Sequence, residues 1–370
     1  MKNTAGLILN VDGEHSNLKD LLHYRSLSTL PFGGRYRLVD FALSNLVNSG
    51  VQRIGAIGSY KYSSLVDHLG TGKEWMLSRK NQNLTILSNS TTGRLDSLLK
   101  INMRELKINQ RFLEKENIDD LIIVSPNLVT NFNFSSALRI HKTNKADITL
   151  IFKKITRENN FLENDIFLDL DKYKVASMSH EDELVTDYYF ADMMIIRRET
   201  LSAFINLFDD TGEMDLLDMI KDNLDSVKVF AAPHVGYLRR ISDLQQYFNA
   251  SMDLLDAEIL RSLFLGDKPI YTKVKDNHPT YYTPTAKTSL SILGSGSRIE
   301  GSIEKSILFR EITVKKNTKI SNSIIMQKAS IGENVTLDYV VLDKDVVIRD
   351  NATLIGNKNN PIVLKKGTKI

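Results

Sequence analysis

Residues 308–354 read LFREITVKKNTKISNSIIMQKASIGENVTLDYVVLDKDVVIRDNATL, and the spacing of their aliphatic residues decides the fold of the C-terminal part. Steps of six, six and five residues recur every 17 positions through Leu308, Val314 and Ile320, then Ile325, Ile331 and Leu337, then Leu342, Ile348 and Leu354. Three short strands per coil, each placing one aliphatic side chain inside a triangular prism, explain this spacing. A β-sandwich would instead show alternation within each strand. The sequence therefore predicts a parallel β-helix.

Upstream, short apolar runs alternate with longer helix-like stretches, which is the pattern of an α/β fold with a mostly parallel sheet. We expect buried strands at 5–9, 53–57, 121–124 and 148–152. Between the first two strands, residues 36–48 place apolar side chains three and four apart, which predicts a helix that ends near Gly50. Ligands of such sheets bind at the carboxyl ends of the strands.

The chain divides into three parts on this basis. Residues 1–255 form the α/β domain, residues 256–286 form an extended linker interrupted by Gly266, Pro279 and Pro284, and residues 287–370 form the β-helix.

Composition excludes several classes of protein. The 370 residues are 42% hydrophobic and 25% charged, the proportions of a globular protein. There is no cysteine, so disulfides, thiolate zinc sites and cysteine nucleophiles are excluded, and we expect a cytoplasmic location. The net charge of +3 is dispersed, which disfavours nucleic acid as a partner, and the longest apolar runs are too short for a membrane span.

The segment 31–45, PFGGRYRLVDFALSN, followed by NSG at 48–50 and RIG at 53–55, closely resembles the N-terminal signature of glucose-1-phosphate adenylyltransferases, also called ADP-glucose pyrophosphorylases. That family also joins a Rossmann-like nucleotidyltransferase domain to a left-handed β-helix, so the resemblance covers nearly the whole chain. It implies a role in glycogen biosynthesis, and the reaction of ATP with glucose 1-phosphate to give ADP-glucose and diphosphate.

Several positions that carry this chemistry in the family differ here. In the phosphate loop, the branched Val11 stands where backbone N–H groups would face the triphosphate, and Asp12 brings negative charge to the same place. Leu27 stands at the position of a lysine. Asn127 and Asn133 occupy two aspartate positions, and Arg240 begins the stretch that reads aspartate, valine, glycine, threonine in the family. Amides lack the charge that a hard divalent cation requires. We therefore expect no catalytic residues, no metal site and no cofactor, with Mg²⁺ used only by a catalytic partner.

This pattern resembles the non-catalytic, GlgD-type regulatory subunit of the family. The resemblance implies a catalytic adenylyltransferase subunit as partner, in a homo- or hetero-tetramer, and a possible sugar-phosphate effector. Arg25, Arg35 and Arg37 are the candidates for an anion-binding regulatory site, because guanidinium groups donate paired hydrogen bonds to phosphate. Equally, Arg35 and Arg37 could pair with acidic residues at a subunit surface.

Two alternatives stay open from the sequence. The chain could be an active sugar-1-phosphate nucleotidyltransferase with an atypical site, or a free-standing sugar-phosphate-binding regulatory protein. A β-helix acyltransferase is disfavoured because no histidine follows His278. We also expect outward-facing side chains of the β-helix, such as Phe309, Met326 and Tyr339, to form a subunit contact.

Overall fold

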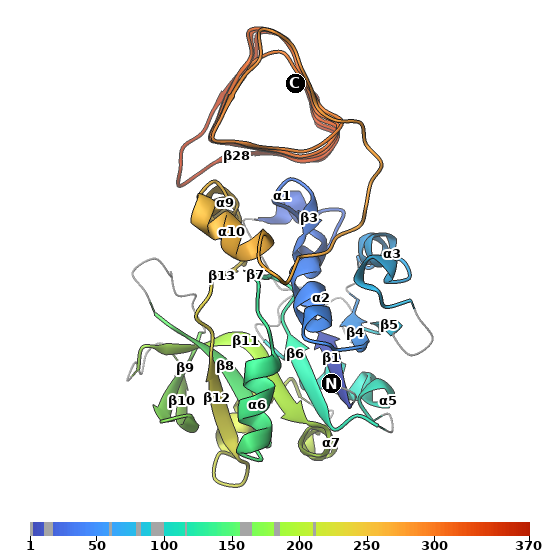
Figure 1. The fold of residues 1–370 in the computed structure, drawn as a ribbon, viewed down its shortest axis with the longest axis vertical. Helices are drawn as coiled ribbons and strands as arrows, with labels where there is room; N and C mark the ends of the chain where they lie inside the picture. Colours follow the sequence, from blue (N-terminus) through green and yellow to red (C-terminus); the bar gives the residue numbers. More distant parts are fainter. Residues whose placement is uncertain are drawn as a thin grey trace.

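The computed structural model describes residues 3–10, 18–58, 61–78, 83–89, 100–114, 117–155, 165–180, 186–209 and 212–370. Figure 1 shows two stacked parts: an α/β domain containing the N-terminus, and a triangular β-helix viewed along its axis at the C-terminal end. This arrangement confirms the predicted fold class.

Within the described residues, the α/β domain is built on a nine-stranded sheet with the order β5-β4-β1-β6-β11-β8-β12-β10-β9. Its strands are β1 (Thr4–Ile8), β4 (Arg53–Ile57), β5 (Asn83–Leu87), β6 (Asp120–Val124), β8 (Ile148–Lys154), β9 (Ile166–Asp171), β10 (Lys174–His180), β11 (Tyr188–Arg197) and β12 (Val229–Pro233). Strand β1 is parallel to both β4 and β6, whereas β11 is antiparallel to β6 and β8. The four strands predicted from the sequence are all present.

Helices cover both faces of this sheet and bury two apolar clusters, one on each face. The helices are α1 (Lys19–Leu22), α2 (Leu38–Asn48), α3 (Ser63–Leu69), α4 (Met103–Ile108), α5 (Gln110–Leu113), α6 (Ser135–Thr143), α7 (Arg198–Leu207), α8 (Leu216–Asp222), α9 (Leu244–Asp253) and α10 (Ala257–Phe264), with 3-10 turns at Leu27–Thr29 and Lys73–Trp75. A two-stranded ladder of β7 (Leu128–Thr130) and β13 (Leu238–Arg240) lies beyond the end of β6.

The predicted helix at 36–48 begins two residues later than expected. Strand β2 (Pro31–Phe32) pairs with β3 (Tyr36–Arg37) across a turn in which Gly33 and Gly34 have φ of +56° and +79°. These left-handed conformations favour glycine. The Asp40 carboxylate then accepts a hydrogen bond from the Arg37 backbone N–H at 2.9 Å and starts the helix. Gly50, with φ of +81°, follows its C-terminal end as predicted.

Three parallel sheets of five strands each form the sides of the β-helix. The first has β14 (Tyr281–Tyr282), β17 (Arg298–Ile299), β20 (Thr313–Val314), β23 (Ser330–Ile331) and β26 (Val347–Ile348). The second has β15 (Lys287–Ser289), β18 (Ser302–Glu304), β21 (Lys319–Ser321), β24 (Thr336–Asp338) and β27 (Thr353–Ile355). The third has β16 (Ile292–Leu293), β19 (Ile307–Leu308), β22 (Ile324–Ile325), β25 (Val340–Leu342) and β28 (Ile362–Leu364).

The register of these sheets confirms the 17-residue repeat. Leu308 pairs with Ile325 and Ile325 with Leu342, and the other two aliphatic rows align in the same way. Asn317, Asn334 and Asn351 stack at one corner, each with positive φ, and their side chains are linked by hydrogen bonds of 3.2 and 3.1 Å. Asparagine tolerates this left-handed conformation better than most residues, so it suits a corner that recurs in every coil.

The segment 256–286 differs from the extended linker that the sequence predicts. The Asp256 carboxylate accepts hydrogen bonds from the backbone of Glu258 and Ile259, at 2.8 and 3.2 Å, and starts helix α10. Strand β14 pairs with β17, so coil pairing begins at Tyr281 and not at residue 287. The prediction relied on the glycine and prolines and overlooked the capping aspartate.

One apolar cluster joins the two parts of the molecule. It combines residues of α1, α2, α9 and α10 with inward-facing residues from all three sheets of the β-helix. Phe309 and Met326 are fully buried in this cluster, and the Tyr339 ring lies 6.1 Å from that of Phe248. The prediction that Phe309 and Met326 face a partner subunit is therefore wrong, because both pack within this chain, whereas Tyr339 is half-buried.

Candidate functional site

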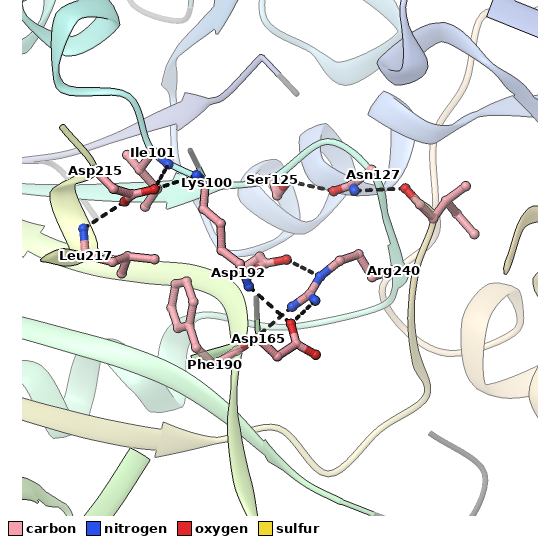
Figure 2. A network of polar contacts seen from close by, with 11 residues as sticks. Lys100, Ile101, Ser125, Asn127, Asp165, Phe190, Asp192, Asp215, Leu217 and Arg240 are labelled. Atoms are coloured by element: carbon pink, nitrogen blue, oxygen red, sulfur yellow. Dashed lines mark hydrogen bonds and ion pairs between the residues drawn. The ribbon is translucent and has the colours of Figure 1, made fainter. Parts of the chain in front are cut away.

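A compact group of charged side chains lies beyond the carboxyl ends of the central strands (Figure 2). The Arg240 guanidinium contacts the carboxylates of Asp165 and Asp192 through separate nitrogen atoms. The Lys100 ammonium lies 3.1 Å from Asp165 and 3.5 Å from Asp192. A third guanidinium contact, of 3.2 Å, is to the carbonyl oxygen of Phe190. Two cations therefore share two carboxylates in a mostly buried position, and we call these four side chains the Arg240 network.

Backbone features orient Asp192 and position the segment of Lys100 in the Arg240 network. Asp192 interrupts the pairing of β11 with β8 and has φ of +52°, a bulge that turns its side chain toward Arg240. The Asp215 carboxylate fixes the segment before α4 by accepting hydrogen bonds from the backbone of Lys100, Ile101 and Leu217. Burial raises the pKa of Asp215, although these backbone hydrogen bonds oppose the shift.

The electrostatics favour a permanently charged Arg240. Burial by itself would lower the pKa of Arg240, but the carboxylates of Asp192 and Asp165 raise it above its ordinary value. Burial also raises the pKa of the neighbouring Tyr189 to about 12, so its phenol stays protonated at neutral pH.

Asn127 follows β6 and is tied to the residue after Arg240. Its side-chain Nδ2 donates to the carbonyl oxygen of Ile241 at 2.9 Å, and its Oδ1 accepts from the Ser125 hydroxyl at 2.6 Å. The side chain is buried, and its backbone carbonyl also accepts from the Ile241 N–H at 2.9 Å. The amide thus uses both its donor and its acceptor, which a carboxylate could not do.

Of the other positions that were predicted to differ from the family, Asn133 and Leu27 do not share the contacts of Asn127. Asn133 is half-buried at the start of α6, where its Oδ1 accepts from the Ser135 backbone at 2.9 Å and lies 3.4 Å from the Ser49 hydroxyl. Leu27 is 1% exposed and belongs to the apolar cluster that joins the two parts. Val11 and Asp12 lie outside the described residues.

The residues present do not fit the magnesium ion that this class of fold implies. Mg²⁺ requires oxygen ligands in octahedral geometry, usually with a carboxylate among them. Here Asn127, Asn133 and Arg240 stand at positions that resemble aspartate positions of the family, and the carboxylates of Asp165 and Asp192 are already paired with cations. No group of three or more His, Cys, Asp or Glu side chains is placed to hold a metal in the part of the chain that the structure describes.

The three candidate regulatory arginines do not form one site. Arg25 is buried, donates to the carbonyl oxygen of Leu21 and pairs with Asp343 at 2.9 Å, so it joins the first helix to the β-helix. Arg35 and Arg37 instead line a pocket of about 260 Å³ between the α/β domain and the β-helix. Arg37 donates to the carbonyl oxygen of Ser64 at 2.7 Å.

This junction pocket is strongly basic. Seven cationic side chains and three carboxylates contribute to its lining: Arg35, Arg37, Lys273, Lys275, Arg310, Lys328 and Lys344, with Asp67, Glu311 and Asp345. Burial, together with nearby Arg37 and Arg25, lowers the pKa of Lys344 to about 7. Burial likewise lowers the pKa of Arg37 and of Arg310. Cations crowded in this way favour an anionic ligand.

Sequence reasoning missed the wall of the junction pocket that comes from the β-helix. Arg310, Gln327 and Lys344 are 17 residues apart, as are Glu311, Lys328 and Asp345, so each trio lies at one corner of successive coils. The repeat length that predicts the β-helix would also have predicted these two rows. The partners of Arg240 gave no such signal, because Lys100, Asp165 and Asp192 are distant in sequence and follow no motif.

Comparisons with known proteins agree with this architecture. A family model described as nucleotidyl transferase matches residues 6–161, and one described as GlmU-like, C-terminal hexapeptide matches residues 280–361. The fold and the position of the site therefore define a nucleotidyltransferase-type protein with a hexapeptide β-helix. No helix among the described residues has the length and apolar character needed to cross a membrane.

Full-length relatives define the family. The chain is 31% identical to the glycogen biosynthesis protein GlgD of Bacillus subtilis, matching 98% of this chain and 95% of that protein. It is 34% identical to GlgD of Geobacillus stearothermophilus, over 95% and 93% of the two chains. A glucose-1-phosphate adenylyltransferase of Bacillus cytotoxicus is 25% identical over 98% of both. The chain belongs to the GlgD glycogen biosynthesis protein family, which is related to the glucose-1-phosphate adenylyltransferases.

Proposed function

We propose that this chain is a cytoplasmic, non-catalytic regulatory subunit that assembles with a glucose-1-phosphate adenylyltransferase and modulates its formation of ADP-glucose in glycogen biosynthesis. The single observation that carries the proposal is the replacement of metal-binding carboxylates by the engaged Asn127 amide and the Arg240 guanidinium. Phosphoryl transfer depends on electrostatic stabilisation of developing charge. An amide and a guanidinium do not bind the metal ion that would provide this stabilisation.

Leu27 supports the same proposal independently of the metal. Its side chain is part of the apolar cluster between the α/β domain and the β-helix. A lysine at this position in the family provides positive charge to phosphate, whereas a leucine provides only packing. Restoring the cation would place an ammonium group among apolar neighbours.

The junction pocket supplies a second element of the proposal, an effector site for a phosphorylated sugar. Its volume of about 260 Å³ and its excess of cations suit a small polyanion. Arg35 and Arg37 come from the α/β domain, whereas Arg310, Lys328 and Lys344 come from the β-helix. A bound anion would therefore attract both parts and stiffen their junction, which gives an effector a route to the subunit contacts.

The test is reconstitution with the catalytic adenylyltransferase of the same organism. We expect the two proteins to co-elute on size exclusion, and the mixture to differ from the catalytic protein alone in ADP-glucose rate or in its response to a sugar bisphosphate. An Arg37→Met variant should still co-elute but lose part of the effector response. The control variant is Lys358→Met, on the exposed loop of the last coil, which should co-elute and keep the full effector response. Separate elution with unchanged kinetics would refute the assignment.

A further inference from the structure

We propose that Arg240 and Lys100 act together as a tethered replacement for a divalent cation, which joins the segments that meet at the candidate site. This inference rests on the proposed function, because it explains what took over the structural role of the metal in a subunit that no longer performs transfer. It concerns the stability of the α/β domain and needs no ligand.

The charge balance is the first argument. Asp165 and Asp192 bring two negative charges to one buried position, with side chains 4% and 10% exposed. Arg240 and Lys100 bring two positive charges, the same total as one divalent ion. Two carboxylates that share a site without a cation repel each other, so one of them would have to become protonated.

Connectivity is the second argument. Asp165 immediately precedes β9, Asp192 lies on β11, Arg240 ends β13 and Lys100 precedes α4. Figure 2 shows the guanidinium between the two carboxylates, with its third contact on the Phe190 carbonyl. A metal ion organises a site by joining ligands from separate segments. A planar guanidinium performs this task with directed hydrogen bonds, and it fits carboxylates better than an ammonium group does.

Tethering is the third argument. A bound ion stabilises a protein only in proportion to its concentration relative to its dissociation constant. The cations of the Arg240 network are covalently part of the chain, so they are always present. The region is therefore held together whether or not magnesium or nucleotide is available, which suits a regulatory subunit that performs no transfer itself.

Thermal unfolding of three Arg240 variants tests the inference. Arg240→Met keeps much of the volume but removes the charge, and we expect its melting temperature to fall by at least about 5 °C. Arg240→Lys keeps the charge without the fork, so its melting temperature should lie between those of the Met variant and the wild type. Combining Arg240→Met with Asp165→Asn and Asp192→Asn removes the unpaired charges, and this triple variant should melt above Arg240→Met alone.

Arg240→Ala allows a separate measurement by chemical rescue. Guanidinium chloride at 20 mM should raise the melting temperature of this variant relative to 20 mM sodium chloride, but should not do so for the wild type. Equal melting temperatures of Arg240→Met and wild type, or a Met variant as stable as the Lys variant, would overturn the inference. If Arg240→Ala does not fold, the comparison of Lys with Met decides the question.

These outcomes are separable from those of the proposed function. If Arg240→Met were as stable as the wild type, the inference that Arg240 replaces a cation would be refuted, but the proposed regulatory role would not be affected. Formation of ADP-glucose by the wild-type protein alone would refute the proposed function whatever the melting temperatures show.

Discussion

Asn127→Asp is the substitution that most sharply separates this structure from an active nucleotidyltransferase. If the site were otherwise that of an active enzyme of the family, an aspartate at this position would restore a metal ligand. In this chain it would remove the Nδ2 donor that bonds the Ile241 carbonyl oxygen at 2.9 Å, and would place a carboxylate oxygen against that carbonyl. The side chain is only 4% exposed, so water cannot replace the lost hydrogen bond.

The magnitude follows from these contacts. Leaving a buried carbonyl without its donor costs about 1–3 kcal/mol, and the buried charge adds to this. The Ser125 hydroxyl still donates to the new carboxylate and offsets part of the loss. We therefore expect the melting temperature to fall by roughly 2–6 °C, without any ADP-glucose formation.

Asn133→Asp is the matched control for this prediction. The Asn133 Oδ1 accepts from the Ser135 backbone, and a carboxylate can accept equally well near the start of α6. This variant should melt within about 2 °C of the wild type. The assay is differential scanning fluorimetry of both variants with and without 10 mM magnesium chloride. If Asn127→Asp were stabilised by magnesium, or were as stable as Asn133→Asp, the interpretation of Asn127 as a structural amide would be refuted.

Three further predictions concern stability, metal and pH. The melting temperature of Leu27→Lys, measured by circular dichroism, should be well below that of Leu27→Met, because an ammonium group would enter the apolar cluster. Equal melting temperatures of the two variants would contradict the burial of Leu27. Neither magnesium chloride nor EDTA should shift the wild-type melting temperature by more than about 1 °C, since no described carboxylate cluster suits the ion. Calorimetric affinity of the junction pocket for a sugar bisphosphate should weaken as pH rises above about 7, because Lys344 loses its proton there and an anion favours the charged form. Lys344→Met should be less pH-dependent, and an unchanged pH profile would exclude Lys344 as the titrating group.

The sign of the Lys344 effect on folding is opposite to its effect on binding. Burial and the neighbouring arginines lower the pKa of Lys344 in the folded protein, so above pH 7 the unfolded chain binds the extra proton. The unfavourable contribution of Lys344 to stability should therefore be present below pH 7 and should diminish as pH rises from 7 toward 10. Lys344→Met should reduce this pH dependence in the window.

The parts of the fold that were predictable are those governed by local periodicity. The 17-residue repeat predicts the β-helix register, because each inward aliphatic side chain stacks on its counterpart in the next coil. Helix α2 was recognisable by its apolar spacing. Helix α10 was missed because its single strong signal is the capping Asp256 within a stretch that contains glycine and proline.

The candidate site shows where sequence reasoning ended. The loss of the metal carboxylate could be seen at Asn127, but the contact of its amide with Ile241 could not, because that contact joins segments 114 residues apart. Arg240 was identified only as a departure from the family motif. Its pairing with Asp192 depends on a bulge in β11 and a positive φ, which no spacing predicts. Likewise Arg25 resembled a phosphate ligand until its partner, Asp343, was placed beside it by the fold.

The most direct test of the central claim is the rate of ADP-glucose formation by the purified chain alone, with ATP, glucose 1-phosphate and magnesium, measured beside the catalytic adenylyltransferase of the same organism. The engaged Asn127 amide, the paired Arg240 and the buried Leu27 predict a rate that cannot be distinguished from a blank without protein. Magnesium-dependent turnover well above that blank would contradict the account, because it would require a catalytic metal in a site where Arg240 already pairs with both nearby carboxylates.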